Sequence, residues 1–276
     1  MNGRSPWIGR PLVVRPLLRI RRNPMFTIRE STITTAAGEL TYWLHRPDHA
    51  QASNALLLTF SSTRQSAFYE EPQEIPARLF AAAGHAVVSF DLPQHGEQVN
   101  TFGQGIEGFC AAVCAGADPF AQFIEQGQAV IDACLAQGVG QGGIVACGVS
   151  RAAYCVLRLA AADPRIRAVA GLAPVTDWRR LREFAAVRDQ PQVDALALDH
   201  WAEHFAGRPL YLAIGHHDER VGSDACVRFV SRLLEAKQAA GDPPPALQFY
   251  LVDSPGHSLA NVWRRAGAEF LLAQLM

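Results

Sequence analysis

Short runs that are apolar at nearly every position recur along the chain, and segments with helical periodicity separate them. Six such runs lie at 55–60, 86–91, 143–148, 168–173, 210–215 and 247–252. Strands of this kind are typical of a parallel sheet that is buried on both faces. The alternation therefore predicts an α/β architecture in which helices cover both faces of a mostly parallel sheet.

The segment 25–47 has a different pattern, because apolar and polar residues alternate on both sides of the turn at Ala36-Ala37-Gly38-Glu39. This pattern predicts an antiparallel hairpin at the start of the sheet. Together with the six apolar runs it makes an eight-stranded sheet, accompanied by at least five helices and no internal repeat. We expect one domain at 25–276.

Residues 1–24 have a separate composition, with six arginines and no acidic residue. Arg15 and Pro16 interrupt the only apolar stretch, so this segment does not resemble a secretion signal and we expect a cytoplasmic protein. We interpret 1–24 as a basic, disordered extension, and Met25 is an alternative start. The net charge of the whole chain is −1, so we expect neither nucleic acid nor a membrane as a partner.

The six cysteines lie at irregular spacings, several of them within apolar runs, and we expect them to be reduced. Cys110 and Cys114 have the spacing of half a metal site, but no second pair follows. His216-His217-Asp218 also invites a metal interpretation, yet neighbouring residues that leave a strand point to opposite sides. We therefore expect no metal and no cofactor.

Gly148-Val149-Ser150-Arg151-Ala152 joins the apolar run 143–148 to a segment with helical periodicity. A serine on a sharp turn from strand to helix projects its hydroxyl above the sheet, as a nucleophile must, and its neighbours have to be small. The same position suits a serine that only caps the helix. The five residues alone leave both interpretations open.

A serine nucleophile needs a base and an acid that orients the base. Asp218 follows the run 210–215 and His257 follows the run 247–252, so both lie at the edge of the sheet where Ser150 lies. We take Asp218 as the acid and His257 as the base. Asp177, after the run 168–173, is the alternative acid, although capping the next helix explains it too.

Two long connections, 93–119 and 176–208, also follow carboxyl ends of strands, where ligands bind in open α/β sheets. We expect them to be small insertions that line a pocket. Ser62, Phe102, Phe109 and Trp178 are candidate pocket residues, but the aromatic ones are equally plausible as packing residues, as is Trp201. His95 either lines the pocket or holds its loop, and we favour the loop role.

The serine, acid and base, in this order, resemble the α/β-hydrolase superfamily over residues 25–276. The segments "SFDLPQHGE" and "GHHDERV" resemble its dienelactone-hydrolase and prolyl-oligopeptidase-like branch. The chain departs from the family at Ala152, where a glycine is usual. It also departs in the loop after the run 55–60, which reads "SSTRQSAF" where many esterases have a His-Gly or Gly-Gly pattern. The resemblance implies an α/β-hydrolase fold and an oxyanion hole made by the backbone N–H groups of Arg151 and of Ser61 or Ser62, of which we favour Ser61.

These features predict a carboxylesterase-like serine hydrolase that cleaves an ester, or a thioester, of a small to medium acyl substrate through an acyl-enzyme on Ser150. An amidase or aminopeptidase-like activity is the alternative within the enzymes. A non-catalytic binding protein of the same fold is the alternative of another class, because the elbow and the oxyanion loop depart from the family pattern. The substrate and the oligomeric state stay open.

Overall fold

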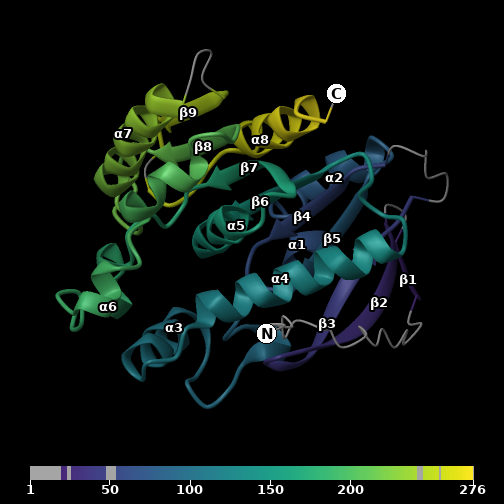
Figure 1. Cartoon of the computed structure of the whole chain (residues 1–276), viewed down its shortest axis with the longest axis horizontal. Coiled ribbons are helices and arrows are strands. Elements are labelled where there is room, and N and C mark those ends of the chain that lie inside the picture. The colour runs from purple at the N-terminus through teal and green to yellow at the C-terminus, as the bar shows by residue number, and fades with distance from the viewer. Residues whose placement is uncertain (1–19, 24–25, 48–53, 241–244, 255, 276) are drawn as a thin grey trace, which may run out of the picture.

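A computed structural model describes residues 20–23, 26–47, 54–240, 245–254 and 256–275 (Figure 1). In this part of the chain nine strands form one sheet in the order β1-β2-β3-β5-β4-β6-β7-β8-β9. The sheet is antiparallel from β1 to β5 and parallel from β5 to β9. The predicted mostly parallel sheet with an antiparallel start is confirmed.

The strands are β1 Ile20–Asn23, β2 Phe26–Thr35, β3 Gly38–His45, β4 Leu56–Phe60, β5 Ala86–Phe90, β6 Ile144–Val149, β7 Ile166–Leu172, β8 Leu210–Gly215 and β9 Leu247–Val252. The α-helices are α1 Arg64–Tyr69, α2 Ile75–Ala82, α3 Gly105–Cys114, α4 Pro119–Ala136, α5 Arg151–Ala162, α6 Pro191–Asp194, α7 Ser223–Ala240 and α8 Asn261–Ala273. Four short 3-10 helices are η1 Gly96–Gln98, η2 Trp178–Arg180, η3 Arg182–Phe184 and η4 Leu198–Phe205.

Strands β2 and β3 form the predicted hairpin, in which Thr35 pairs with Gly38 across a two-residue turn. Gly38 has a φ of 113°, a conformation that L-residues rarely adopt. The eight predicted strands correspond to β2–β9. Strand β1 was not predicted, because its four residues were assigned to the basic extension; it pairs with β2 at the edge of the sheet. Residues 1–19 of that extension and Met25 lie outside the described residues.

Strand β4 lies at the centre of the topology. The chain passes from β4 to β5 on one side and then returns to β6 on the other side of β4. Such a reversal opens a crevice at the carboxyl ends of the two central strands, where α/β proteins bind ligands. Phe60 pairs with Gly148, so the residues that follow β4 and β6 lie side by side at this crevice.

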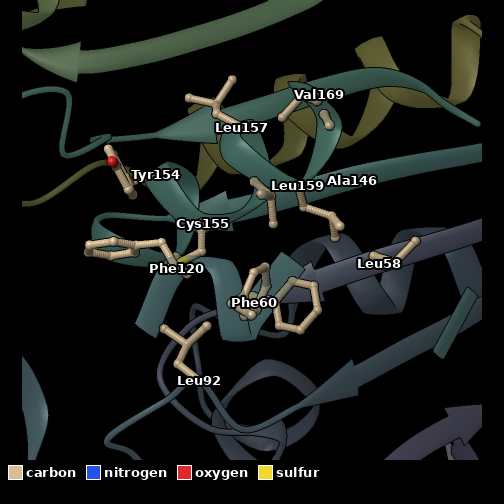
Figure 2. Packing of buried hydrophobic residues seen from close by; sticks show 14 of the residues in the cluster. Leu58, Phe60, Leu92, Phe120, Ala146, Tyr154, Cys155, Leu157, Leu159 and Val169 are labelled. Carbon is tan, nitrogen blue, oxygen red and sulfur yellow. The ribbon is translucent and has the colours of Figure 1, made fainter. Parts of the chain in front are cut away.

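Helices cover both faces of the sheet, as predicted. Helices α1, α2 and α8 cover one face, and α3, α4, α5 and α7 cover the other. Figure 2 shows the second interface, where Phe60 of β4 lies among apolar side chains of β6 and α5. Each large apolar side chain that is fully buried here stabilises the fold by roughly 2–3 kcal/mol. This packing holds the carboxyl ends of β4 and β6 in place.

The two long connections are ordered rather than open loops. Segment 93–119 carries η1 and α3, and segment 176–208 carries η2, η3, α6 and η4. The two segments meet where α3 contacts η3. Over the ranges that the structure describes, no helix is both long enough and apolar enough to span a membrane.

Gly148 allows the close approach of β6 and α5. A Cβ atom at this position would lie 2.5 Å from the carbonyl oxygen of Ala152, a backbone atom that cannot move aside. We expect Gly148→Ala to lower the free energy of unfolding by about 1–3 kcal/mol.

Gly207→Ala is the matched control, because no atom lies within 4 Å of the Cβ that it would add. Its effect should stay within about 0.5 kcal/mol. Urea unfolding followed by circular dichroism measures both variants. Equal stability of the two variants would contradict the steric role of Gly148.

Candidate active site

Ser150 lies on a strained turn between β6 and α5. Its φ is 58° and its ψ is −122°, a conformation that costs a non-glycine residue about 1–3 kcal/mol. The turn is held by its backbone, since Ser150 N–H donates to Leu172 O at 2.8 Å and Val175 N–H donates to Ser150 O at 3.1 Å. The side chain makes no capping hydrogen bond to α5, so the interpretation of Ser150 as an ordinary helix cap is wrong.

Ala152 stands where the family pattern has glycine, and the structure accommodates its methyl group. The residue is fully buried in the first turn of α5. Gly148, rather than position 152, is where an added Cβ would clash. The departure at Ala152 is therefore compatible with the sharp turn.

His257 joins Ser150 to Asp218. Its Nε2 lies 2.9 Å from Ser150 Oγ, and its Nδ1 lies 2.7 Å from Asp218 Oδ2. Because an ionised carboxylate only accepts hydrogen bonds, we assign the imidazole proton to Nδ1, which leaves Nε2 free to accept the hydroxyl proton of Ser150. The structure thus brings together the three residues that the sequence nominated.

Asp218 is held in place by the loop after β8. It is 1% exposed, and its Oδ1 accepts hydrogen bonds from the N–H groups of Arg220 and Val221 at 3.1 and 3.2 Å. These two bonds use one oxygen and leave Oδ2 for His257. The local turn therefore orients the carboxylate toward the imidazole.

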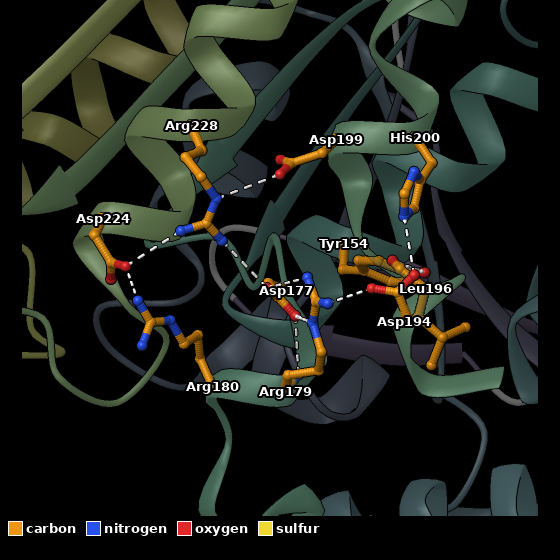
Figure 3. Close-up of polar contacts among 10 residues, drawn as sticks. All are labelled: Tyr154, Asp177, Arg179, Arg180, Asp194, Leu196, Asp199, His200, Asp224 and Arg228. Atoms are coloured by element: carbon orange, nitrogen blue, oxygen red, sulfur yellow. Dashed lines mark hydrogen bonds and ion pairs between the residues drawn. The ribbon is translucent and has the colours of Figure 1, made fainter. Parts of the chain in front are cut away.

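Asp177, the alternative acid, has other partners (Figure 3). It caps η2, and its carboxylate forms ion pairs with Arg179 at 2.8 Å and Arg228 at 3.3 Å. Burial alone would raise the pKa of Asp177, but the hydrogen bonds and charges of these arginines lower it overall. Asp177 thus has the capping role, and the bond to His257 comes from Asp218.

The loop after β4 lies beside the serine turn. Ser62 N–H points to Ser66 Oγ at 3.4 Å, and Ser62 Oγ accepts a hydrogen bond from the Arg151 side chain. Within the described part of the chain, the N–H groups of Ser61 and Arg151 have no hydrogen-bond partner. Both groups are therefore free to donate to an oxygen atom of a ligand.

His95 is buried behind this loop, with 5% of its surface exposed. Its Nδ1 lies 2.9 Å from Pro93 O, which assigns a proton to Nδ1, and its Nε2 accepts a hydrogen bond from Arg151 Nε at 2.9 Å. Burial and then the charge of Arg151 lower the pKa of His95 to about 4, so the ring is neutral at neutral pH. His95 holds its own loop and also holds the side chain of Arg151.

Phe109 and Trp178 were candidate pocket residues with core packing as the alternative, and the structure gives them the packing role. Both are 0% exposed. Phe109 stacks on Phe120 with ring centroids 5.3 Å apart, and Trp178 packs edge-on against Tyr154 at 5.2 Å. They form the core beneath the insertions, whereas Phe102 is half-buried. The sequence shows that such aromatic residues lie near the crevice but not which way their side chains point.

A cavity of about 520 Å³ adjoins His257, and its other lining residues are His217, Glu219, Arg220 and Gly256. The sequence analysis did not nominate His217, Glu219 or Arg220 as cavity residues, although all three lie within two residues of the predicted acid. A larger cavity of about 680 Å³ lies between η4 and α7 and includes no residue of the Ser150–His257–Asp218 set. We place the candidate active site at the smaller of these two cavities, because His257, which bonds both Ser150 and Asp218, lines it.

His216 and His217 do not diverge as the sequence analysis expected. Their ring centroids lie 4.1 Å apart, because β8 ends at Gly215 and the alternation of a strand stops there. Among the described residues, no group of three or more histidine, cysteine, aspartate or glutamate side chains has a geometry that would hold a metal ion.

Solved structures of similar shape include an acetyl xylan esterase from Paenibacillus sp. R4, with a TM-score of 0.72 and 17% identity over 96% of this chain and 89% of that chain. A cold-adapted esterase from an Arctic intertidal metagenomic library gives 0.69 and 18%, covering 95% and 100% of the two chains. The chain has the α/β-hydrolase fold.

A longer protein, the acylaminoacyl peptidase of Pyrococcus horikoshii, gives a TM-score of 0.64 and 12% identity. The match covers 91% of this chain but only 41% of the peptidase. No protein-family model and no curated protein sequence matches the chain. The α/β-hydrolase fold is thus shared with esterases and with the corresponding part of a peptidase.

The low pKa of His95 should make the protein less stable in acid. Well above pH 6.5 the His95 ring is neutral in both the folded and the unfolded chain, so its titration does not change the free energy of unfolding. As the pH falls from 6.5 toward 4, the unfolded chain takes up a proton that the folded chain excludes, which favours unfolding. By pH 5 this loss should reach about 2 kcal/mol.

His95→Gln cannot take up this proton, so its stability should fall less between pH 7.5 and pH 5 than that of the wild type. Urea unfolding at both pH values measures the difference. Asp91 and Arg151, the charged groups that act on His95, are the same in both proteins. Parallel pH dependence in the two proteins would contradict the buried, neutral state of His95.

Proposed function

We propose that this protein is a serine hydrolase that cleaves an ester through an acyl-enzyme on Ser150. The observation that carries the proposal is the continuous hydrogen-bonded chain from Asp218 through His257 to Ser150 Oγ, which ends on a residue of positive φ. A strained serine whose hydroxyl is hydrogen-bonded to an imidazole nitrogen has the geometry of an activated nucleophile.

In the first half of the reaction, Ser150 Oγ attacks the carbonyl carbon while its proton passes to His257 Nε2. The tetrahedral intermediate then expels the alcohol, which takes that proton, and the acyl group stays on Ser150. Asp218 stabilises the imidazolium that forms in between. In the second half, water gives a proton to His257 and attacks the acyl carbon, which releases the acid and restores Ser150.

The negative oxygen of the intermediate needs fixed donors. The backbone N–H groups of Ser61 and Arg151 support this role, since both end a strand-to-loop or strand-to-helix junction at the crevice and neither is used by the described residues. Loss of one such donor typically costs about 3–4 kcal/mol of transition-state stabilisation. The loop "SSTRQSAF" departs from the family pattern in its side chains. It still offers a backbone N–H donor at Ser61.

An ester is the favoured substrate class, because similar structures of comparable length are esterases. A thioester is compatible with the same chemistry. The acylaminoacyl peptidase supports the amidase alternative less well, since this chain covers only 41% of it. A non-catalytic role is disfavoured, because a binding protein has no use for a strained serine aligned with a histidine and an aspartate.

Ser150→Ala should abolish covalent labelling by a fluorophosphonate probe, since the probe reacts with the activated hydroxyl. The labelling is measured by intact-protein mass spectrometry. Ser231→Ala is the matched control, because Ser231 is an exposed serine of α7 whose hydroxyl donates to Val227 O. The control should label as the wild type does. Labelling that persists in Ser150→Ala would overturn the proposal.

Asp218→Asn should lower kcat for 4-nitrophenyl butyrate by about 10⁴-fold, because the amide cannot hold the imidazole in the required tautomer. Asp177→Asn should lower kcat less than about tenfold while it lowers the free energy of unfolding by about 1–2 kcal/mol through its lost arginine contacts. The reverse order of the two kcat losses would assign the acid to Asp177.

An aminoacyl 4-nitroanilide in the same assay distinguishes esterase from amidase: we expect the ester to react faster.

A further inference from the structure

The side chain of Arg151 carries a charge that the described residues do not neutralise at contact distance. Its Nε donates to His95 Nε2 at 2.9 Å, and its Nη2 donates to Ser62 Oγ. Both acceptors are neutral, because His95 holds its one proton on Nδ1 toward Pro93 O. Within the described ranges, no carboxylate forms an ion pair with this guanidinium.

Arg220 provides the contrast, because it lines the cavity beside His257 and is fully paired. Both of its terminal nitrogens bind Glu183 of η3 at 2.7 Å. The positive charge of Arg220 lowers the pKa of Arg151, and the negative charge of Glu183 raises it. The carboxylate of Glu183 is already paired with Arg220 and Arg182, and it forms no ion pair with Arg151.

A partly buried guanidinium without a counter-ion is costly, and burial lowers the pKa of Arg151. Arginine nevertheless stays charged in proteins. The guanidinium has five N–H donors, of which His95 and Ser62 use two. Its planar fork suits a carboxylate, which can accept two parallel hydrogen bonds.

The guanidinium of Arg151 lies beside the proposed oxyanion hole. Arg151 directly follows Ser150, and its side chain reaches Ser62, the neighbour of the proposed oxyanion donor Ser61. Two fixed contacts from separate loops hold the guanidinium on the oxyanion side of the site. A charge fixed there lies beside the loop that carries the proposed oxyanion donor Ser61.

We propose that the Arg151 side chain binds a carboxylate of the substrate, so that the preferred substrates are esters that carry a carboxylate close to the scissile bond. This inference rests on the proposed ester hydrolysis at Ser150 and names its substrate class. His95 and Ser62 are positioning residues for Arg151.

The test compares kcat/KM for two pairs of esters with the wild-type protein. Mono-4-nitrophenyl glutarate and its methyl ester place the carboxylate, or its neutral equivalent, on the acyl side. 4-Acetoxybenzoate and its methyl ester place it on the alcohol side. Rates are corrected with Ser150→Ala. We expect a preference of at least tenfold for the charged member of one pair, and 1 M NaCl should reduce this preference.

Arg151→Gln should lower the charged-to-neutral ratio of kcat/KM by about 100-fold, mainly through KM, and Arg151→Lys should restore part of it. The ratio is the readout because any disturbance of Ser150 affects both esters equally. Arg232→Gln is the matched control, since Arg232 lies exposed on α7 and pairs with Glu235. This control should keep the wild-type ratio.

A wild-type measurement decides the matter if Arg151→Gln does not fold. Glutaramate should inhibit hydrolysis of 4-nitrophenyl butyrate at least tenfold more strongly than the neutral glutaramide. Absence of a charge preference in both pairs, or a ratio that Arg151→Gln leaves unchanged, would overturn the inference even while neutral esters are hydrolysed. No hydrolysis of any ester, together with no fluorophosphonate labelling, would instead overturn the proposed function.

Discussion

The strained turn at Ser150 is the constraint on which the rest of the site depends. A non-glycine residue stays at a φ of 58° only when its surroundings supply more than the strain costs. Here β6 lies between the buried strands β4 and β7, α5 packs on them, and the backbone of the turn is bonded to Leu172 and Val175. The packing that offsets the strain of the turn also orients the Ser150 hydroxyl toward the crevice.

Each loop around the crevice holds or neutralises a different polar group. The loop after β8 uses two backbone N–H groups to hold one oxygen of Asp218, which leaves the other oxygen for His257. The insertion 176–208 carries Glu183, which neutralises Arg220. The loop after β5 carries His95, which stays neutral and holds Arg151 without cancelling its charge. Among the described residues, the Arg151 guanidinium is thus left without a carboxylate partner.

Much of the fold was predictable because local patterns determine it. Runs apolar throughout identified six parallel strands, alternation identified the β2–β3 hairpin, and the order of Ser150, Asp218 and His257 along the chain identified the site. The edge strand β1 was missed, because four residues within an arginine-rich segment carry no apolar pattern. The orientations of Phe109 and Trp178 stayed open between pocket and core, because a loop sequence does not show which side of the loop faces the core.

By itself, the sequence determined the class of fold, the edge of the sheet at which the site lies and the three residues that meet there, because hydrophobic periodicity and strand order are properties of the chain. Only the tertiary structure showed that Ser150 makes no side-chain cap and bonds to His257, that His257 bonds to Asp218 rather than Asp177, and that Phe109 and Trp178 are buried in the core. It also revealed the unneutralised charge of Arg151. These outcomes depend on backbone dihedral angles and on contacts between residues distant in sequence, and no local pattern encodes them.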